Sequence, residues 1–251
     1  MSELVPQILR FDSLPSTNLE AARQAIEGAP EGVCIVAGEQ TSGRGRLQRQ
    51  WVSPKGAGLY FSIILRPQFP QSTWPLLTMM AAIAVRDALL EACAIETDIK
   101  WPNDILVNEK KLCGILAETV ETPLGRAVVV GIGINLTKGS FPLELDSIAT
   151  DVETAGKQKP ELEVVLNALV RALVGYYQIL QQGGGPATIT REWTTRSSYS
   201  EGKRISVSFG AESLVGTTRG LESDGALRVE TTAGEIKTIR AGDVTAVRAS
   251  Y

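Results

Sequence analysis

The segment from Ile99 to Leu136 limits the possible folds more than any other part of the chain. Its apolar runs are interrupted by turn residues at Pro102-Asn103-Asp104, at Asn108 to Lys110, and again at Gly125-Arg126. None of these interruptions is long enough to hold a helix, and strands joined by such short connections are antiparallel neighbours. The segment therefore predicts a run of hairpin strands in one sheet.

Helices and further strands are predicted on both sides of this region. Pro75 to Cys93 is apolar around most of its circumference, which indicates a helix packed on a sheet. Residues 160–182 carry one apolar face at helical spacing, and a shorter helix follows through Trp193. The remaining predicted segments are strands at 4–11, 33–37 and 58–65, a helix at 17–26, and irregular structure at 137–160.

The periodicity changes at Gly202. Ile205, Val207 and Phe209 alternate with polar residues, and turn signals such as Asp224-Gly225 separate the short strands that follow. These later strands are predicted at 214–218, 227–230, 236–239 and 244–248. The fold class is therefore α+β, with a mixed or antiparallel central sheet flanked by helices in residues 1–198 and a small β domain in residues 199–251.

Composition excludes several kinds of chemistry. The 251 residues include no histidine, which removes Ser-His-Asp and Cys-His catalysis and the common histidine-based zinc sites. A net charge of −3 argues against a nucleic-acid-binding domain. Cys34, Cys93 and Cys113 lie far apart in apolar runs, so they are expected to be reduced core residues of a cytoplasmic protein. No signal-like N-terminus is evident, and the apolar runs are too short to predict a membrane span.

The arginine loop, from Gly38 to Trp51, is the strongest candidate for a binding element. It follows the apolar run Val33 to Ala37 and holds Arg44, Arg46 and Arg49 among glycines. Arginine binds carboxylates and phosphates through paired hydrogen bonds, and the indole offers a flat apolar face. These features predict a mobile loop that folds over an anionic small molecule. A solvated loop and a weak RNA-binding segment are the alternatives, and the acidic composition argues against the second.

A second group of polar residues brackets the hairpin region. Lys100, Trp101, Asn103, Asp104 and Lys111 lie in one short stretch beside predicted buried strands. Asparagine and aspartate are common in turns, but this density of polar groups exceeds what a turn requires. The stretch is therefore a second candidate for the site.

Two other motifs have structural interpretations. The glycines of Gly131 to Leu136 form a weak dinucleotide fingerprint, because the third glycine and the following helix are missing. They instead predict a strand that a ligand or another backbone approaches closely. Thr17 and Glu20 are spaced as a capping box, and a helix N-terminus there could also present amides and hydroxyls to a polar ligand.

Four motifs, taken in order, resemble the biotin protein ligases, or biotin–[acetyl-CoA-carboxylase] ligases. They are the GRGR loop that ends at Trp51, KWPND at 100–104, KLCGILAE at 111–118 and GIGINL at 131–136. The resemblance covers essentially the whole chain, because the C-terminal β domain also looks like the family's SH3-like module. It implies a fold similar to that of class II synthetases and the biotin–lipoate ligases, with a small SH3-like β-barrel.

The resemblance also implies a reaction. The family joins biotin to ATP to give biotinyl-5′-AMP and pyrophosphate, and then transfers biotin to a lysine of a biotin carboxyl carrier protein. The expected substrates are biotin and ATP, Mg²⁺ is expected to arrive with ATP, and the expected partner is the carrier protein of acetyl-CoA carboxylase. Cations placed where negative charge develops lower such a barrier, and a loop that excludes water protects the reactive mixed anhydride.

Individual roles follow from the same resemblance. The residues implied to bind biotin are Ser16, Thr17, Gln40, Gly43, Arg44, Arg46, Lys111, Gly114 and Ile115. The residues implied to bind the nucleotide are Arg44, Trp51, Asn103 and Asn135. The residues implied to act in catalysis are Arg46, Asp104 and Lys111. For Asp104 three roles stay open: orienting Lys111, helping to hold a metal, or receiving the proton of the acceptor lysine.

Two features depart from parts of the family. Gln48 stands where the family loop usually has a second glycine, which predicts a stiffer loop and weakens the transfer of a family role to Arg49. The chain enters the catalytic domain within its first dozen residues, so a ligase without DNA binding or repressor function is expected. Its oligomeric state is open between a monomer and a homodimer, with the dimer favoured.

Two other functions compete with this interpretation. A lipoate–protein ligase has a similar catalytic domain, although the tryptophan-ended loop and the C-terminal barrel favour biotin. A non-catalytic biotin-sensing or RNA-binding module is the other alternative.

Overall fold

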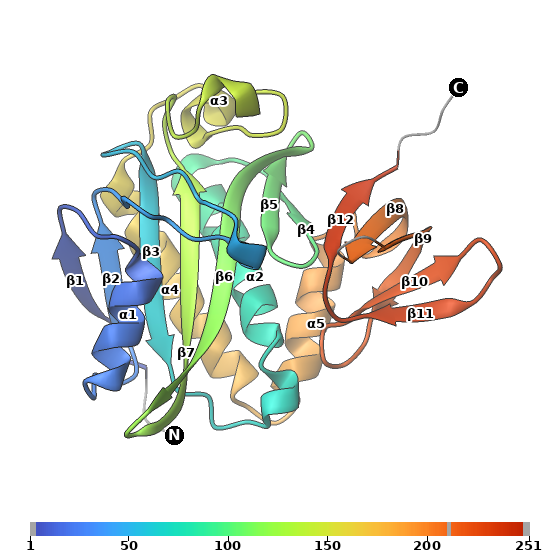
Figure 1. The fold of residues 1–251 in the computed structure, drawn as a ribbon, viewed down its shortest axis with the longest axis horizontal. Helices are drawn as coiled ribbons and strands as arrows, with labels where there is room; N and C mark the ends of the chain where they lie inside the picture. The colour runs from blue at the N-terminus through green and yellow to red at the C-terminus, as the bar shows by residue number, and fades with distance from the viewer. Residues whose placement is uncertain (1–3, 210–211, 248–251) are drawn as a thin grey trace.

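The protein, described by a computed structural model over residues 4–209 and 212–247, has two sheets (Figure 1). The larger sheet has seven strands in the order β1-β2-β3-β7-β6-β5-β4. Its strands are β1 (Gln7–Phe11), β2 (Val33–Ala37), β3 (Gly58–Leu65), β4 (Asp98–Lys100), β5 (Asp104–Val107), β6 (Lys110–Thr122) and β7 (Gly125–Asn135). β1 and β2 are parallel and the other neighbours are antiparallel, which confirms the predicted mixed sheet.

The predicted run of hairpins forms the centre and one edge of this sheet. β4, β5, β6 and β7 follow one another in the chain and pair as antiparallel neighbours. β7 also pairs with β3, so the long β6–β7 hairpin lies in the middle. In its register, Gly114 of β6 lies directly opposite Gly133 of β7.

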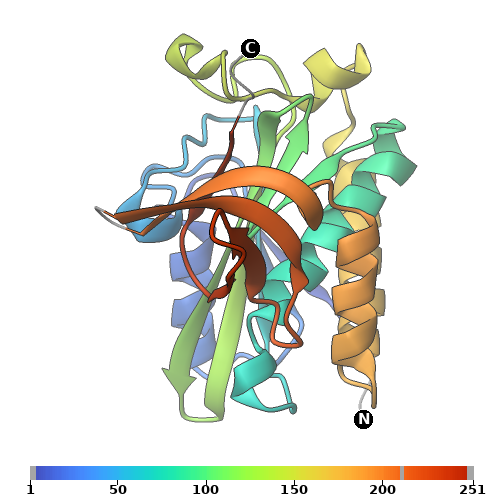
Figure 2. The same cartoon turned by 90° about the vertical axis from the view of Figure 1, so that its right-hand side faces the viewer.

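Helices cover the two faces of the sheet unequally (Figures 1 and 2). α1 (Thr17–Ile26) packs on one face, whereas α2 (Leu76–Cys93), α4 (Leu162–Leu180) and α5 (Gly185–Thr195) form a layer on the other. α2 is buried along most of its length because it contacts both the sheet and α4. Among the described helices, α4 alone has the length and mean hydropathy of a membrane span, and here its apolar face packs against α2.

The second sheet is built from the last five strands. They are β8 (Glu201–Phe209), β9 (Glu212–Leu221), β10 (Leu227–Thr231), β11 (Ile236–Ile239) and β12 (Asp243–Ala246). They pair antiparallel in the order β11-β10-β9-β8-β12, and the sheet is strongly curved (Figure 2). The five predicted strands are thus present, although the predicted end of the last one at residue 248 lies outside the described residues. The domain division at 198 and 199 stays a prediction.

Two local predictions were wrong. Glu20 pairs with Arg23 and does not cap α1; instead Oε1 of Gln40 accepts a hydrogen bond from the Thr17 backbone N–H at 2.8 Å. The helix N-terminus is therefore satisfied by a tertiary contact that local spacing cannot reveal. The segment 137–160 also holds the short helix α3 (Val152–Gly156), which is opened by the carboxylate of Asp151.

The three cysteines are free, as predicted. Cys34 and Cys113 are fully buried in β2 and β6. Burial raises the pKa of the Cys34 thiol to about 12 and raises that of Cys113 further. Both thiols are therefore protonated at neutral pH and serve as small apolar core groups.

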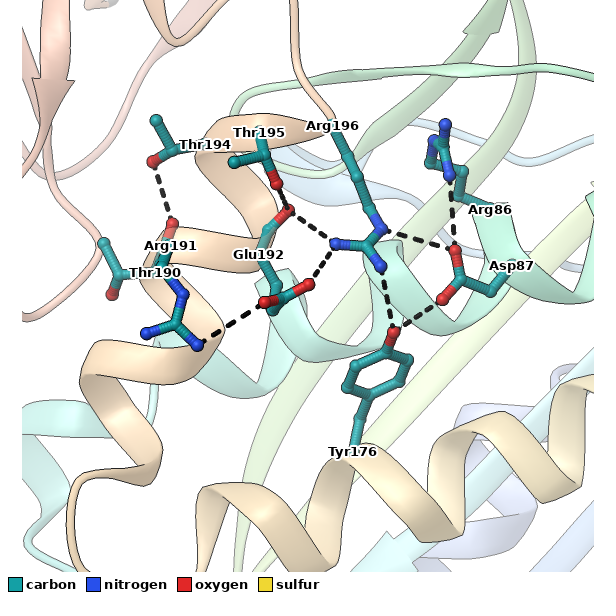
Figure 3. Close-up of polar contacts among 9 residues, drawn as sticks. All are labelled: Arg86, Asp87, Tyr176, Thr190, Arg191, Glu192, Thr194, Thr195 and Arg196. Atoms are coloured by element: carbon teal, nitrogen blue, oxygen red, sulfur yellow. Dashed lines mark hydrogen bonds and ion pairs between the residues drawn. The ribbon is translucent and has the colours of Figure 1, made fainter.

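A polar network ties the end of α5 to α2 and α4 (Figure 3). Asp87 of α2 accepts hydrogen bonds from the hydroxyl of Tyr176 at 2.5 Å and from Nε of Arg196 at 3.4 Å. Burial and the bond to Asp87 raise the pKa of Tyr176 to about 12, so the hydroxyl stays a neutral donor. Arg196 also pairs with Glu192 one turn earlier. Because Arg196 follows α5 directly, the network fixes the direction in which the chain enters the second sheet.

Further contacts hold the second sheet against the first. The indole Nε1 of the buried Trp101 donates to the carbonyl of Gly225 at 3.0 Å. The hydroxyl of Ser197 donates to the carbonyl of Ile99 in β4 at 2.5 Å. A Cβ added to Gly225 would lie 2.9 Å from Sδ of Met79, so the turn at 224–226 packs tightly on α2. The second sheet is thus fixed beside the β4 edge.

Replacement of Gly131 in β7 should test how tightly the face that carries α1 is packed. A Cβ there would lie 1.9 Å from Oδ1 of Asn18, and that side chain cannot retreat because it is bonded to Ser62, Leu116 and Glu118. Gly131→Ala should lower the free energy of unfolding by about 2 kcal/mol, the usual cost of overpacking. Urea denaturation would measure the loss.

Gly175→Ala is the matched control. Gly175 lies in α4, and nothing lies within 4 Å of an added Cβ. Alanine should raise the free energy of unfolding there by about 0.5 to 1 kcal/mol. Equal stabilities of the two variants would show that the face around Gly131 is looser than described.

Candidate active site

A cavity of about 870 Å³ opens on the face of the large sheet that carries α1. The arginine loop crosses in front of β3 and β7 toward β6 (Figure 1). The segment 140–149 and the end of β12 form other walls. The predicted site residues that line the cavity are Ser16, Thr17, Gln40, Arg44, Arg46, Trp51, Asn103, Asp104, Lys111, Gly114, Ile115 and Asn135.

Gly43 is the one predicted site residue that does not line the cavity among the described residues. It is buried at the base of the arginine loop, where its carbonyl accepts the N–H of Trp51 at 2.9 Å. A Cβ at this position would lie 2.2 Å from the carbonyl oxygen of Trp51. Gly43 therefore lets the two arms of the loop approach each other.

Trp51 rests on a surface made of glycines. A Cβ added to Gly133 would lie 2.5 Å from its indole Nε1, and one added to Gly114 would lie 3.1 Å from its six-membered ring. These two glycines are cross-strand neighbours, so together they make room for one aromatic ring. The glycines of GIGINL thus admit side chains, Trp51 at Gly133 and Asn18 at Gly131, where a ligand or backbone was expected.

Lys111 lies between this indole and a carboxylate. Its Nζ is 5.4 Å from the Trp51 ring centroid and 2.6 Å from Oδ1 of Asp104. Nζ of Lys100 lies 3.5 Å from the other oxygen of Asp104. The Asp104 side chain is mostly buried, whereas that of Lys111 is one-third exposed toward the cavity. The contacts match the first of the three roles left open for Asp104, orienting Lys111.

Gln40 joins the arginine loop to the start of α1. Its Oε1 accepts hydrogen bonds from the backbone N–H and the hydroxyl of Thr17, at 2.8 and 3.2 Å. Its Nε2 donates to the hydroxyl of Ser53 at 2.8 Å. Ser16 is buried beside them on the cavity wall. These residues form a fixed polar wall at one end of the cavity.

Arg44 crosses the cavity to β6. Its Nη2 lies 2.9 Å from Oε1 of Glu118, whose other oxygen accepts a hydrogen bond from Asn18 at 2.8 Å. The Arg44 side chain is about one-third exposed, with a relative accessibility of 37%. Arg44 can therefore exchange this partner for a ligand anion without a large change in its own burial.

Arg46 and the two asparagines lie deeper in the site. Nη1 of Arg46 donates to Oδ1 of Asn103 at 3.0 Å. Asn103 in turn donates to the carbonyl of Ile115 at 2.8 Å. Asn135 is buried and donates to the carbonyl of Thr150 at 3.0 Å, which fixes the segment that follows 140–149. Both asparagines position backbone around the cavity.

The tip of the arginine loop is a short 3-10 turn with an unusual backbone. Leu47 and Gln48 have φ values of 53° and 61°, in the left-handed region that favours glycine. Each such residue costs of order 1 kcal/mol relative to an ordinary conformation. Gln48 thus adopts a left-handed backbone that glycine would adopt at a lower conformational cost, and the backbone hydrogen bonds of the turn and the contacts of the flanking arginines offset that cost.

Sequence reasoning missed several residues of the site. Glu118 pairs with Arg44, Asn18 donates to Glu118, and Asp243 of β12 faces the arginine loop, but none of the three was assigned a role. Glu118 ends a quoted motif, which was an available signal. For Asp243 the sequence offers no signal, because its closeness to the arginine loop depends on how the second sheet is fixed beside β4.

The described residues contain no group of three or more acidic or cysteine side chains that could hold a metal ion. Three carboxylates near the cations, Asp104, Glu118 and Asp243, are each engaged by lysine or arginine. A divalent ion would therefore find its negative oxygens mainly on a bound phosphate.

Comparisons with known proteins agree with this geometry. The Biotin/lipoate A/B protein ligase family profile matches residues 9–135, and the biotin protein ligase C terminal domain profile matches residues 202–245. The chain is 33% identical over 239 residues to the biotin–[acetyl-CoA-carboxylase] ligase of Mycobacterium tuberculosis, covering 93% of this chain and 86% of that protein. It is 40% identical over 245 residues to the bifunctional ligase/repressor BirA of Bacillus subtilis, covering 94% and 73%.

A solved structure supports the same assignment. The biotin protein ligase from Aquifex aeolicus in complex with biotin and ATP matches with a TM-score of 0.84 and 27% sequence identity, covering 97% of this chain and 99% of that one. The chain therefore belongs to the biotin protein ligases of the biotin/lipoate A/B protein ligase family.

Proposed function

We propose that this protein activates biotin with ATP and transfers it to a lysine of a biotin carboxyl carrier protein. The observation that carries the proposal is the convergence of Lys111, Arg44 and Arg46 on one glycine-lined cavity under the arginine loop. In the first step a carboxylate oxygen of biotin attacks the α-phosphorus of ATP, and the bond to pyrophosphate breaks. In the second step the acceptor amine attacks the biotinyl carbonyl, and AMP leaves.

The cations of the cavity can stabilise the negative charge that is brought together in the first step. A carboxylate and a phosphate repel each other, and the negative charge on the oxygens of the transferring phosphoryl group has to be stabilised in the transition state. Lys111 is held in place by Asp104 and by the face of Trp51, so it needs little reorganisation as charge develops. Asp104 thus acts here by positioning Lys111.

The walls of the cavity suit the two substrates. The polar wall of Gln40, Thr17 and Ser16 offers fixed partners for the ureido ring of biotin, and the Trp51 face suits an aromatic or apolar ligand surface. Mg²⁺ would enter with the nucleotide phosphates, because the described residues supply no carboxylate cluster. Asn103, Asn135 and Arg44 are proposed for the nucleotide side.

The acceptor protein and the cellular location of this protein are also proposed. The acceptor would be the carrier protein of acetyl-CoA carboxylase, as the name of the Mycobacterium tuberculosis relative indicates for that protein. A cytoplasmic location agrees with three free cysteines, two of them buried.

Substrate choice is the direct test of this function. Isothermal titration should show biotin binding that is at least about a hundredfold tighter than lipoate binding, since fixed polar partners discriminate strongly against a ligand that cannot pair with them. Incubation with biotin, MgATP and carrier protein should then give a band on a streptavidin blot. Tight lipoate binding, or an unlabelled carrier, would contradict the proposal.

Lys111→Ala should separate catalysis from binding. Loss of a preorganised cation should slow pyrophosphate release by about a hundredfold to a thousandfold. Biotin affinity should change little, because the polar wall around Gln40 is untouched. Lys110→Ala is the control, since Lys110 is the neighbouring lysine and donates to Asp146 outside the cavity lining. Equal rates of pyrophosphate release in the two variants would show that Lys111 has no role in the first step.

Arg46→Gly should weaken retention of the adenylate. Arg46 connects the arginine loop to Asn103, and its loss should let the loop open more often. The expected result is biotin on lysines of a bystander protein such as albumin, at several times the wild-type level. A bystander signal equal to that of the wild type would show that Arg46 does not retain the intermediate.

A further inference from the structure

The C-terminal sheet reaches the arginine loop through one carboxylate. Asp243 is the first residue of β12 and lines the cavity. Its Oδ2 pairs with Nη2 of Arg49 in a very short contact, and its Oδ1 lies 3.9 Å from Nη1 of Arg46. The carbonyl of the preceding residue, Gly242, accepts a hydrogen bond from Nη2 of Arg46 at 3.3 Å. Two arginines of the loop are thus bound at one point of the second sheet.

The base of this loop is tied to the start of α1 through Gln40 and the backbone, whereas its arginine side chains make only a few contacts outside the loop among the described residues. Within the described residues, the side chains of its three arginines reach outside the loop to Glu118, Asn103, Gly242 and Asp243. The first two belong to the large sheet and its turn, and the last two belong to the second sheet. Arg46, at one end of the loop tip, is tied to both sheets, whereas the side chain of Arg49, at the other end, reaches only the second sheet among the described residues.

The tip is also the strained part of the loop. Leu47 and Gln48 both lie in the left-handed region, and the side chain of Leu47 is 69% exposed. Exposed apolar contact cannot compensate this strain. Backbone hydrogen bonds from Gly45 to Arg49 and from Arg49 to Arg46 close the turn, and the contacts of the flanking arginines hold it against the second sheet.

We propose that Asp243 is a positioning residue that holds the arginine loop over the cavity from the C-terminal domain. This proposal gives a role to Arg49, the arginine to which a family role could be assigned least well because Gln48 precedes it. It also gives the second sheet a part in the reaction: that sheet, fixed by the contacts of Trp101 and Ser197, presents the carboxylate that the loop closes on.

Limited proteolysis with chymotrypsin measures loop opening without any assumption about function. Chymotrypsin cleaves after Leu47 only when the tip leaves its folded shape, and none of the substitutions alters that residue. Asp243→Asn and Arg49→Gln should each raise the cleavage rate at Leu47 about threefold to tenfold. Because both remove the same ion pair, the double variant should be cleaved no faster than the faster single variant.

Three controls separate a positioning role from general loosening. Glu222→Gln removes a carboxylate that directly follows β9 and pairs with Arg228, and it should leave cleavage at Leu47 unchanged. Asp243→Glu keeps the charge and should restore at least half of the protection. NaCl at about 0.5 M screens exposed ion pairs. It should therefore speed cleavage of the wild type, in which the Asp243–Arg49 pair is present, but not of Asp243→Asn, in which that pair is absent.

An activity readout follows, and it rests on the proposed function. Asp243→Asn, given biotin and MgATP, should label bystander lysines several times more than the wild type while its biotin affinity stays the same. A protein that makes no adenylate at all would contradict the proposed function but not the cleavage result. The inference itself is overturned if both single variants are cleaved at the rate of Glu222→Gln, or if their effects multiply in the double variant.

Discussion

The site exists because three positions on one face of the β6–β7 hairpin carry no side chain. Gly114 and Gly133 leave the space that the Trp51 ring occupies, and Gly131 leaves the space of the Asn18 amide. Any larger residue would push these side chains away from the sheet. The Lys111 ammonium is positioned against Trp51, and Arg44 is held by the carboxylate that also binds Asn18. Absence of side chains on the sheet thus determines where the cations lie.

The polarity of the cavity is divided between its walls. The wall near α1 consists of neutral amides and hydroxyls that already bond to one another, whereas the wall near β5 and β6 has ammonium and carboxylate groups in contact. A neutral heterocycle suits the first wall and an anion suits the second. The arginine loop spans both walls, since Gln40 lies at its start and Arg44 and Arg46 lie farther along.

The local sequence pattern was sufficient to predict structure where residues that are neighbours in sequence are also neighbours in space. The hairpins between Ile99 and Leu136, the helix α4 and the five strands after Gly202 were predicted because periodicity and turn residues determine them. Of the residues that were assigned roles from the family resemblance, all but Gly43 line the cavity among the described residues. Prediction failed where a distant segment decides the outcome. Gln40 accepts from the first turn of α1 where Glu20 was predicted to cap it, and Asp243 reaches the arginine loop from the second sheet; neither contact has a periodic or spacing signal.

The bonds of Gln40 also determine what its end of the cavity can recognise. A primary amide normally offers both an acceptor and two donors, and it can rotate to suit its partner. Here Thr17 directs two protons at the oxygen, and Ser53 takes one of the two nitrogen protons. Rotation would place donor against donor at the start of α1, so the orientation is locked. Gln40 can therefore offer only its remaining N–H to the cavity, as a hydrogen-bond donor. This end of the cavity thus favours ligand groups that accept hydrogen bonds, and the preference is present before a ligand binds.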